Sequence, residues 1–322
     1  MKIKNRETTK KSSIIFLVFL LQSCIVNVPL GRFREPLEEV TVLGTGRDKI
    51  VLINISGVIS WDRRGGGLFG EDEPSIVSRI KEELDKARQD TKVKGVLLKV
   101  ESPGGLISAS EIIYQEIKKF KQEKKIPIVS YISSLGASGA YYVIMPSDKI
   151  IASPGSTVGS IGVYMIKVNL KELSDKVGVQ IEVIKAGKYK DALLPHRGLT
   201  DEERLKIQSM INYYYESFKR VVVEGRKGKL RKSIDEISDG SVFTPAEAVE
   251  LGIIDDIGDL YYAIEELAKI AGTRDYRIVA YTRGGRNLNS IWDETYSNQK
   301  ITEFLNLLTE GIHIFYLYPA EM

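Results

Sequence analysis

Short apolar runs rich in β-branched residues recur along this chain and constrain its fold more than any other feature. They occupy residues 49–59, 95–100, 127–133, 149–153 and 181–187. Between them, residues 74–89 and 108–119 place apolar side chains at the spacing of amphipathic helices. Strands that alternate with helices form βαβ units around a buried, mostly parallel sheet. The pattern therefore predicts an α/β protein.

The second half of the chain predicts three more helices and one more strand. A long helix begins after Thr200, with Glu203 at the capping-box position. Its predicted apolar stripe consists of Leu205, Met210, Ile211, Tyr214, Phe218 and Val221 or Val222. Shorter helices are predicted within residues 243–252 and 260–271, and a strand within residues 276–281. No internal repeat interrupts residues 48–272, which we expect to form one domain.

The first 24 residues have the composition of an export signal. Five basic residues precede the apolar run 14–21, which is too short to span a bilayer of about 30 Å. The segment ends in Leu21-Gln22-Ser23-Cys24, which resembles a bacterial lipoprotein box with a large Gln22 in place of a small residue. That resemblance implies that Cys24 is lipidated, and a plain signal peptide or an uncleaved anchor is the alternative. Residues 25–47, with Pro and Gly, are predicted to be a tether.

Composition excludes several other classes of protein. The net charge of +3 gives no concentrated basic face, so no nucleic-acid partner is expected. The single cysteine cannot form an internal disulfide. No motif indicates a metal or a cofactor. Residues 273–322 are expected to be a C-terminal extension, whose apolar segment 312–318 docks on a neighbouring subunit or caps an active site.

The stretch Leu135-Gly136-Ala137-Ser138-Gly139-Ala140-Tyr141-Tyr142 follows a predicted strand and surrounds a serine with small residues. An exposed nucleophile on a strand-to-helix turn needs small neighbours. Ser138 is therefore a candidate nucleophile, although the same residues also suit tight packing of a helix on a sheet. The pair Gly104-Gly105 follows another strand, and the carboxyl ends of parallel strands share one edge of a sheet.

A serine nucleophile needs a base that accepts its proton. The chain has only two histidines, His196 in a predicted loop and His313 in the tail, so a triad with histidine has few possible members. A lysine can serve instead where burial lowers its pKa. Two lysines, Lys188 and Lys190, lie downstream of Ser138 and would share one face of a strand. The residues alone leave the choice between them open.

Several motifs together resemble one protein family. Ser102-Pro103-Gly104-Gly105 resembles the oxyanion loop of the Clp protease and crotonase superfamily. The Ser138 turn, residues 157–163, Gly187-Lys188-Tyr189-Lys190-Asp191 and residues 239–258 resemble, in this order, the motifs of signal peptide peptidases of family S49. The resemblance covers residues 48–272. It implies a Clp protease/crotonase-like fold with repeated ββα and βαβ units and one catalytic domain.

The resemblance also implies roles for individual residues. Ser138 would be the nucleophile, Lys190 the general base and Ser160 the hydroxyl that orients the lysine. The amides of Gly105 and Gly139 would form the oxyanion hole, with Gly104 shaping the loop. Glu101 and Ala140 depart from the residues common in the family, and Glu101 would alter the charge near the substrate backbone.

The resemblance finally implies a biological setting. The chain would be a lipid-anchored serine endopeptidase on the extracytoplasmic side of a bacterial membrane. It would form a homo-oligomeric ring in which neighbouring subunits share active sites, and it would degrade apolar signal peptide remnants. Two alternatives are a crotonase-fold enzyme acting on acyl-CoA, against which the export signal counts, and a non-catalytic lipoprotein that uses the same scaffold for binding.

Overall fold

We describe a computed structural model of the chain. Side chains are described for residues 35–62, 74–283 and 288–293, and the backbone alone for residues 314–317. From Leu37 onward the described residues belong to one compact unit. The predicted signal segment, including Cys24, lies outside the described residues. Within the described part of the chain, no helix is both long enough and apolar enough to cross a membrane.

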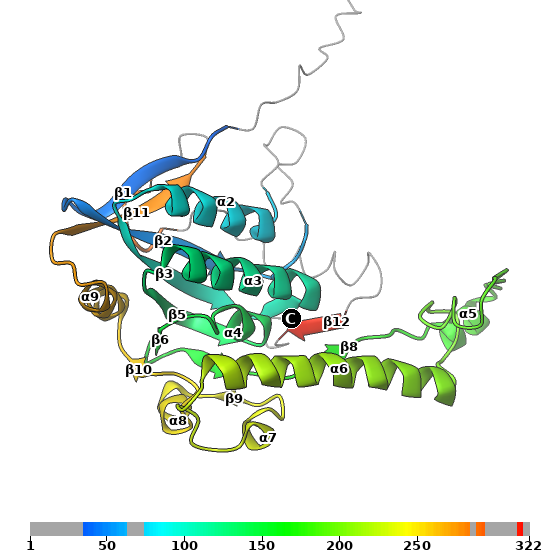
Figure 1. The fold of residues 1–322 in the computed structure, drawn as a ribbon. Coiled ribbons are helices and arrows are strands. Elements are labelled where there is room, and N and C mark those ends of the chain that lie inside the picture. Colours follow the sequence, from blue (N-terminus) through cyan, green and yellow to red (C-terminus); the bar gives the residue numbers. More distant parts are fainter. Residues whose placement is uncertain (1–34, 63–73, 284–287, 294–313, 318–322) are drawn as a thin grey trace, which may run out of the picture. The chain divides into compact units, whose positions relative to one another are not determined.

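A mostly parallel sheet forms the centre of this unit (Figure 1). Its strands are β1 (Glu38–Gly44), β2 (Asp48–Ser56), β3 (Val93–Ser102), β5 (Ile128–Ala137), β6 (Lys149–Ala152), β7 (Thr157–Gly159), β9 (Val242–Phe243), β10 (Asp256–Ile257) and β11 (Tyr276–Thr282). The order is β1-β11-β2-β3-β5-β6-β10, and β7 pairs with both β5 and β9. The β1–β11 and β7–β9 pairs are antiparallel, and the remaining pairs are parallel. The predicted α/β class is confirmed.

Helices cover both faces of the sheet, as Figure 1 shows for α2 and α3 on one face and α9 on the other. The helices are α2 (Ile76–Gln89), α3 (Ile107–Lys124), α4 (Gly139–Val143), α5 (Lys171–Val177), α6 (Asp201–Gly225), α7 (Ile234–Ile237), α8 (Pro245–Glu250) and α9 (Leu260–Ile270). Alternate residues of β2 enter two separate cores. Val51 and Ile53 pack in the core under α2 and α3, whereas Ile50 and Leu52 pack against α9. This burial on both faces explains the continuous apolar run at residues 50–53 of β2.

A second, smaller sheet lies at the edge where the candidate site residues gather. Among the described residues it contains β4 (Gly104–Leu106), β8 (Tyr164–Met165) and β12 (Ile314–Leu317). The strand β12 lies between the other two and runs antiparallel to both. The C-terminal segment thus pairs with strands of its own chain.

The sheet extends beyond the expected boundaries of the domain. Strand β1 lies inside the predicted tether, and β11 lies after residue 272. They pair with each other, and β11 also pairs with β2, so both belong to the central sheet. The alternating residues of β1 are only partly buried because β1 is an edge strand, and this weak pattern explains why the sequence did not predict it.

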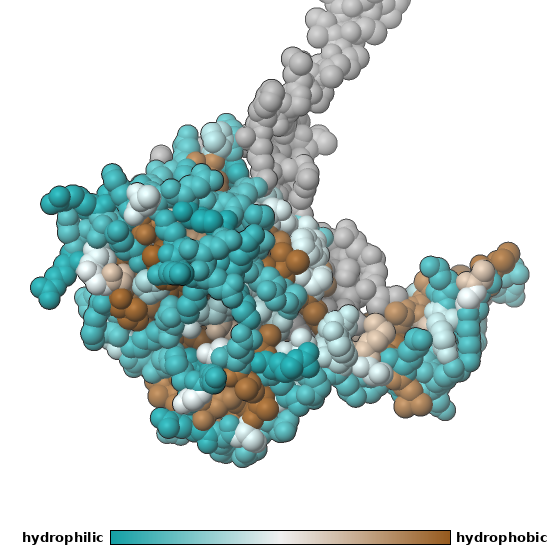
Figure 2. Space-filling view, viewed as in Figure 1, coloured by the Kyte–Doolittle hydropathy of each residue, from teal (hydrophilic) through white to brown (hydrophobic). Residues whose placement is uncertain are grey.

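The segment between β8 and α6, residues 166–199, is named the α5 arm here. Only Asp191 and Ala192 of its residues are buried. Its exposed apolar side chains include Val168, Leu173, Val177, Val179, Ile181 and Ile184, the last 95% exposed. Figure 2 shows apolar side chains gathered on this arm. The strand predicted at residues 181–187 is wrong, because this stretch is irregular and pairs with no described strand.

The predicted apolar stripe of α6 is buried over only part of its length. The capping box of Thr200 and Glu203 forms as predicted. Phe218, Val221 and Val222 are buried, whereas Leu205 is 71% exposed and Met210 is 45% exposed. The N-terminal part of the predicted stripe therefore lies outside the core of this chain.

Candidate active site

Ser138 lies on a tight turn between β5 and α4. Its φ of 54° and ψ of −119° belong to a region that residues other than glycine rarely adopt. Its backbone N–H donates to the carbonyl oxygen of Gly159 at 2.7 Å, and its own carbonyl oxygen accepts from Tyr142 at 2.9 Å. These bonds hold the strained turn at the carboxyl end of a buried parallel strand. A nucleophile on a strained strand-to-helix turn has this local structure.

Gly139, the other predicted oxyanion donor, is the first residue of α4. Amides in the first turn of a helix have no acceptor within that helix. The Gly139 N–H directly follows the predicted nucleophile in the chain. In nucleophile turns between a strand and a helix, the backbone N–H of the residue after the nucleophile is one of the oxyanion donors.

Ser160 occupies the same place on the next parallel strand. Ala137 pairs with Gly159 at the ends of β5 and β7, so Ser138 and Ser160 are the next residues on adjacent strands. Ser160 also has a positive φ, 51°, and is 6% exposed. Its N–H donates to the carbonyl oxygen of Ser241 at 2.7 Å. The register thus brings the two predicted site serines to one level of the sheet edge.

The predicted oxyanion loop lies on the other side of the Ser138 turn. Ser102, at the end of β3, pairs with Gly136 on β5, so the residues after both strands lie side by side. Gly104 has a φ of 96°, and its N–H donates to Ser102 Oγ at 3.1 Å. Three neighbouring strands of one sheet are therefore followed by predicted site residues: Gly104 and Gly105, Ser138, and Ser160. The sequence predicted this shared edge for the two glycines and Ser138.

Gly105 is fixed by contact with a backbone that the sequence did not single out. The N–H of Ile59 donates to Gly104 at 2.7 Å, and the N–H of Leu106 donates to Ile59 at 2.8 Å. A Cβ on Gly105 would lie 2.1 Å from the Ile59 carbonyl oxygen, so only glycine fits. Because amides alternate in direction along a strand, the Gly105 N–H points away from Ile59.

The strand β12 lies on the side toward which the Gly105 amide points. Its residues 315–317 pair with β4, with position 316 opposite Gly105. Its other edge pairs with Tyr164 and Met165 of β8. The space between β4 and β8, named the β4–β8 slot here, thus holds one extended peptide segment beside a predicted oxyanion donor.

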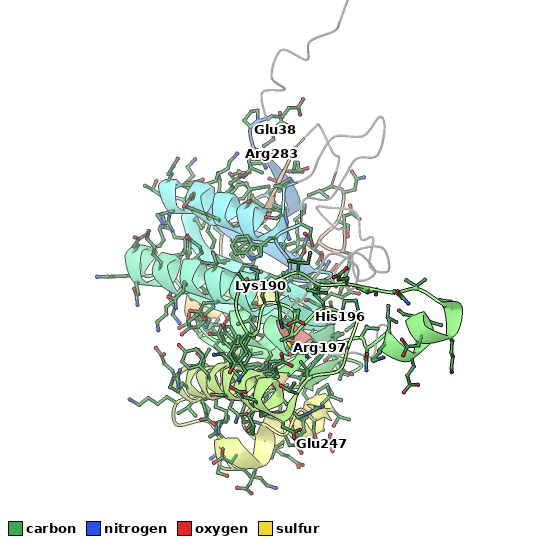
Figure 3. All side chains as sticks on the ribbon, turned by 90° about the vertical axis from the view of Figure 1, so that its right-hand side faces the viewer. Glu38, Lys190, His196, Arg197, Glu247 and Arg283 are labelled. Carbon is green, nitrogen blue, oxygen red and sulfur yellow. The ribbon has the colours of Figure 1, made fainter. Side chains whose placement is uncertain are left out.

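Lys190 lies in a turn of the α5 arm rather than on the predicted strand. Its N–H donates to the carbonyl oxygen of Gly187 at 3.2 Å, and its side chain is exposed. No hydrogen bond or ion pair among the described residues joins this side chain to Ser138 or Ser160. Figure 3 labels Lys190 on the segment that leads to His196 and Arg197. Within the described part of this chain, the predicted nucleophile and the predicted base are therefore not hydrogen-bonded to each other.

The neighbouring Lys188 is in a different situation. Its ammonium forms an ion pair with Glu202 at the start of α6, and this hydrogen bond raises the pKa of Lys188. Tyr189 also donates to Glu202. No carboxylate within the described residues pairs with Lys190. The two lysines that the sequence left as alternatives are thus distinguished by their partners.

A polar cluster holds the residue that follows Lys190. The Asp191 carboxylate accepts from Arg197 at 2.9 and 3.1 Å and also contacts Lys185 and His196. Hydrogen bonds from Arg197, chiefly, hold the pKa of Asp191 far below its usual range. The sequence motif included Asp191, but only the folded turn reveals its partners. As for metals, no group of three or more His, Cys, Asp or Glu side chains within the described ranges could hold an ion.

Comparison with known proteins defines the class of this protein. The family model described as Peptidase family S49 matches residues 120–274. A protein of Methanocaldococcus jannaschii named "Putative protease" is 37% identical over 237 residues, which are 73% of this chain and 75% of that protein. The "Putative signal peptide peptidase SppA" of Enterococcus faecium is 34% identical over 258 residues, 80% of this chain and 74% of that protein. The chain belongs to peptidase family S49 and is a protease of that family.

Among solved structures, a mutant of the 1510-N membrane-bound stomatin-specific protease aligns with a TM-score of 0.43. That alignment has 18% identity and covers 69% of this chain and 85% of the other.

Proposed function

We propose that the chain is a serine endopeptidase with a Ser138/Lys190 dyad that cleaves apolar peptides of the signal-peptide type. The observation that carries the proposal is the alignment of three strand ends. The strained Ser138 turn lies between Ser160 on one neighbouring strand and the glycine pair of the oxyanion loop on the other. Membership of family S49 supports the protease class, and the relative named after signal peptides supports the substrate class.

In the proposed reaction, Ser138 Oγ forms a bond to the carbonyl carbon of the scissile peptide while Lys190 Nζ takes the hydroxyl proton. The amides of Gly105 and Gly139 stabilise the negative charge on the tetrahedral oxygen. The carbon–nitrogen bond then breaks, and Lys190 returns the proton to the leaving amine. Water attacks the acyl-enzyme, again with Lys190 as the base, and Ser138 regains its proton.

The β4–β8 slot supports an extended substrate. A strand bound there gains main-chain hydrogen bonds from two sides, and this mode of recognition depends little on the peptide's sequence. We propose that the substrate replaces β12 in the slot, so that its backbone passes the Gly105 amide.

The exposure of Lys190 supports an active site shared between subunits. A lysine acts as a base near neutral pH only when its pKa is lowered, and burial away from water lowers it. Lys190 is exposed on this chain, and the arm that carries it has unburied apolar side chains. We propose that the α5 arm packs on a neighbouring copy in a ring, which would cover these side chains and bring Lys190 to the neighbour's Ser138.

For location, we propose that lipidation at Cys24 anchors the chain to a bacterial membrane with its catalytic domain outside the cytoplasm. Attachment through acyl chains suits an enzyme whose substrates remain in the bilayer. The basic and apolar residues before Cys24 support export.

A labelling experiment tests the catalytic proposal. Purified full-length protein is incubated with an apolar fluorogenic peptide and, separately, with a serine-reactive phosphonate, beside Ser138→Ala, Lys190→Gln and Lys188→Gln. We expect cleavage and one phosphonate adduct per chain in the unchanged protein. Ser138→Ala should abolish both and Lys190→Gln should abolish turnover. Lys188→Gln, which removes the Glu202 ion pair and the contact with the Tyr189 ring, should keep most of the turnover.

Two outcomes would contradict the proposal. Full turnover in Ser138→Ala would exclude Ser138 as the nucleophile, and loss of turnover in Lys188→Gln alone would identify the other lysine as the base. A folded, unmodified and inactive protein would favour the non-catalytic binding scaffold. Saturable binding of an acyl-CoA would favour the crotonase-type enzyme.

A further inference from the structure

Arg197 connects the turn that carries Lys190 to the start of helix α6. One edge of its guanidinium donates to both oxygens of Asp191, at 2.9 and 3.1 Å. The adjacent edge, formed by Nη1 and the shared Nη2, donates to both oxygens of Glu203, at 2.8 and 2.7 Å. Both carboxylates are almost fully buried, with side chains 7% and 5% exposed. A planar guanidinium suits such two-sided binding, which the flexible, point-like charge of lysine cannot reproduce.

Glu203 is a rigid end of this connection. It is the third helical residue of α6, and its carboxylate also accepts from the Thr200 N–H at 2.9 Å. In return, Thr200 Oγ1 accepts from the Glu203 N–H at 3.2 Å, which completes the capping box. The position of Glu203 is therefore set by a 25-residue helix whose other end packs in the core through Phe218 and Val222.

Asp191 is the other end of this connection, and it directly follows Lys190. The other residues of the turn, 185–190, contribute no buried side chain. Apolar packing therefore does little to hold the turn, and its connections to α6 are polar. Lys188 and Tyr189 contact Glu202 at the exposed surface, whereas the Asp191 carboxylate pairs with Arg197 in a buried position. Lys185 and His196 contact the same carboxylate, but both belong to the arm itself and give no connection to the core.

We propose that Arg197 is the positioning residue of the base, holding the Lys190 turn at a fixed place relative to helix α6. Arg197 acts through Asp191 and does not touch the substrate. The proposal rests on the proposed role of Lys190. A displacement of about 1 Å in a catalytic group can reduce a rate by roughly 10²-fold, so loss of this connection should reduce the chemical step far more than substrate binding.

The test compares Arg197→Met, Arg197→Lys and Asp191→Asn in the full-length protein. The matched control is Lys219→Met in α6, which removes the ion pairs of Lys219 with Glu216 on α6 and Asp235 on α7, away from the Lys190 turn. The measurements are kcat and KM for the fluorogenic peptide, the rate at which a phosphonate labels Ser138, the melting temperature and the mass of the assembly by light scattering.

We expect Arg197→Met to lower kcat and the labelling rate by roughly 10- to 100-fold, with KM within about 2-fold and the assembly intact. Arg197→Lys should recover part of the loss, and Asp191→Asn should resemble Arg197→Met. Lys219→Met should keep full kcat.

Other results would overturn the proposal. An unchanged kcat in Arg197→Met, a loss that appears only in KM, or a loss that accompanies dissociation of the assembly would each exclude a positioning role. If Arg197→Met fails to fold, the same criteria apply to Asp191→Asn, which keeps the shape of the side chain. Activity in Ser138→Ala or Lys190→Gln would instead refute the underlying dyad, so the two failures are distinguishable.

Discussion

Ser138 and Ser160 stand next to each other in register at the ends of the parallel strands β5 and β7, and both have a left-handed backbone, with φ of 54° and 51°. The Ser138 N–H donates to Gly159, the residue just before Ser160. A backbone hydrogen bond therefore connects the two turns directly. This arrangement suits a pair in which one hydroxyl attacks and the other orients the base.

The proposed role of Ser160 as the hydroxyl that orients Lys190 predicts a selective kinetic loss. Ser160→Ala should lower kcat by roughly 10²-fold with little change in KM, since an unoriented lysine is misplaced for proton transfer. The backbone strain at this position is similar for serine and alanine, so the melting temperature should change little. The matched control is Ser156→Ala, another buried serine, whose hydroxyl bonds only its own turn at Ser153. Equal kcat in the two variants would contradict the orienting role.

The close approach of Ile59 to Gly105 predicts that alanine cannot replace this glycine. A Cβ would displace β4 and with it the amide that we propose faces the oxyanion, so kcat should fall by roughly 10²- to 10³-fold. The free energy of unfolding should also fall, by about 1 to 3 kcal/mol. Gly155→Ala is the control, because its Cβ would meet nothing within 4 Å. Steady-state kinetics and urea unfolding measure both effects, and a fully active Gly105→Ala would exclude the predicted oxyanion donor.

The pairing of β12 with β4 and β8 predicts that the tail competes with substrate. Removal of residues 312–322 should lower KM for a fluorogenic peptide, because the slot no longer has to be vacated. A synthetic peptide of residues 312–322 should then inhibit the shortened protein, whereas a scrambled peptide should not. An unchanged KM, or inhibition by both peptides alike, would show that the slot is not where substrate binds.

The buried Glu83 predicts a specific dependence of stability on pH. Burial, opposed in part by Arg79, raises its pKa from 4.5 to about 7. The unfolded chain therefore loses this proton first as pH rises, so the contribution of Glu83 to stability declines between pH 4.5 and about 7. The decline amounts to roughly 3 kcal/mol. Urea unfolding should show it in the unchanged protein but not in Glu83→Gln, and parallel pH profiles of the two proteins would contradict it.

The sequence predicted the central strands and the Ser138 turn well, because burial on both faces leaves continuous apolar runs and because small residues mark the turn. The prediction failed at two segments whose apolar patterns indicated buried side chains but did not identify the surface that buries them. Residues 181–187 and the first half of the α6 stripe are apolar, yet both are exposed on this chain. Periodicity shows which side chains avoid water, but it does not show which surface covers them.

The contacts around Lys190 were beyond sequence reasoning for another reason. Arg197 meets Asp191 and Glu203 only because a turn of irregular backbone folds back on the first turn of α6, and no periodic pattern encodes such a turn. Glu203 was predicted for its capping role alone. Its second role is to accept hydrogen bonds from Arg197 with the same carboxylate. Only the folded structure shows that Arg197 lies beside it.

The position of β12 within the same chain has a consequence for selectivity. A tethered segment competes at an effective concentration that can reach the millimolar range, however dilute the protein is. In the proposed binding mode, a free peptide must outcompete this tethered segment, through higher affinity or higher local concentration, before it enters the β4–β8 slot. Weakly binding segments, such as the loops of folded exported proteins, would remain outside, whereas peptides concentrated in a bilayer would reach it.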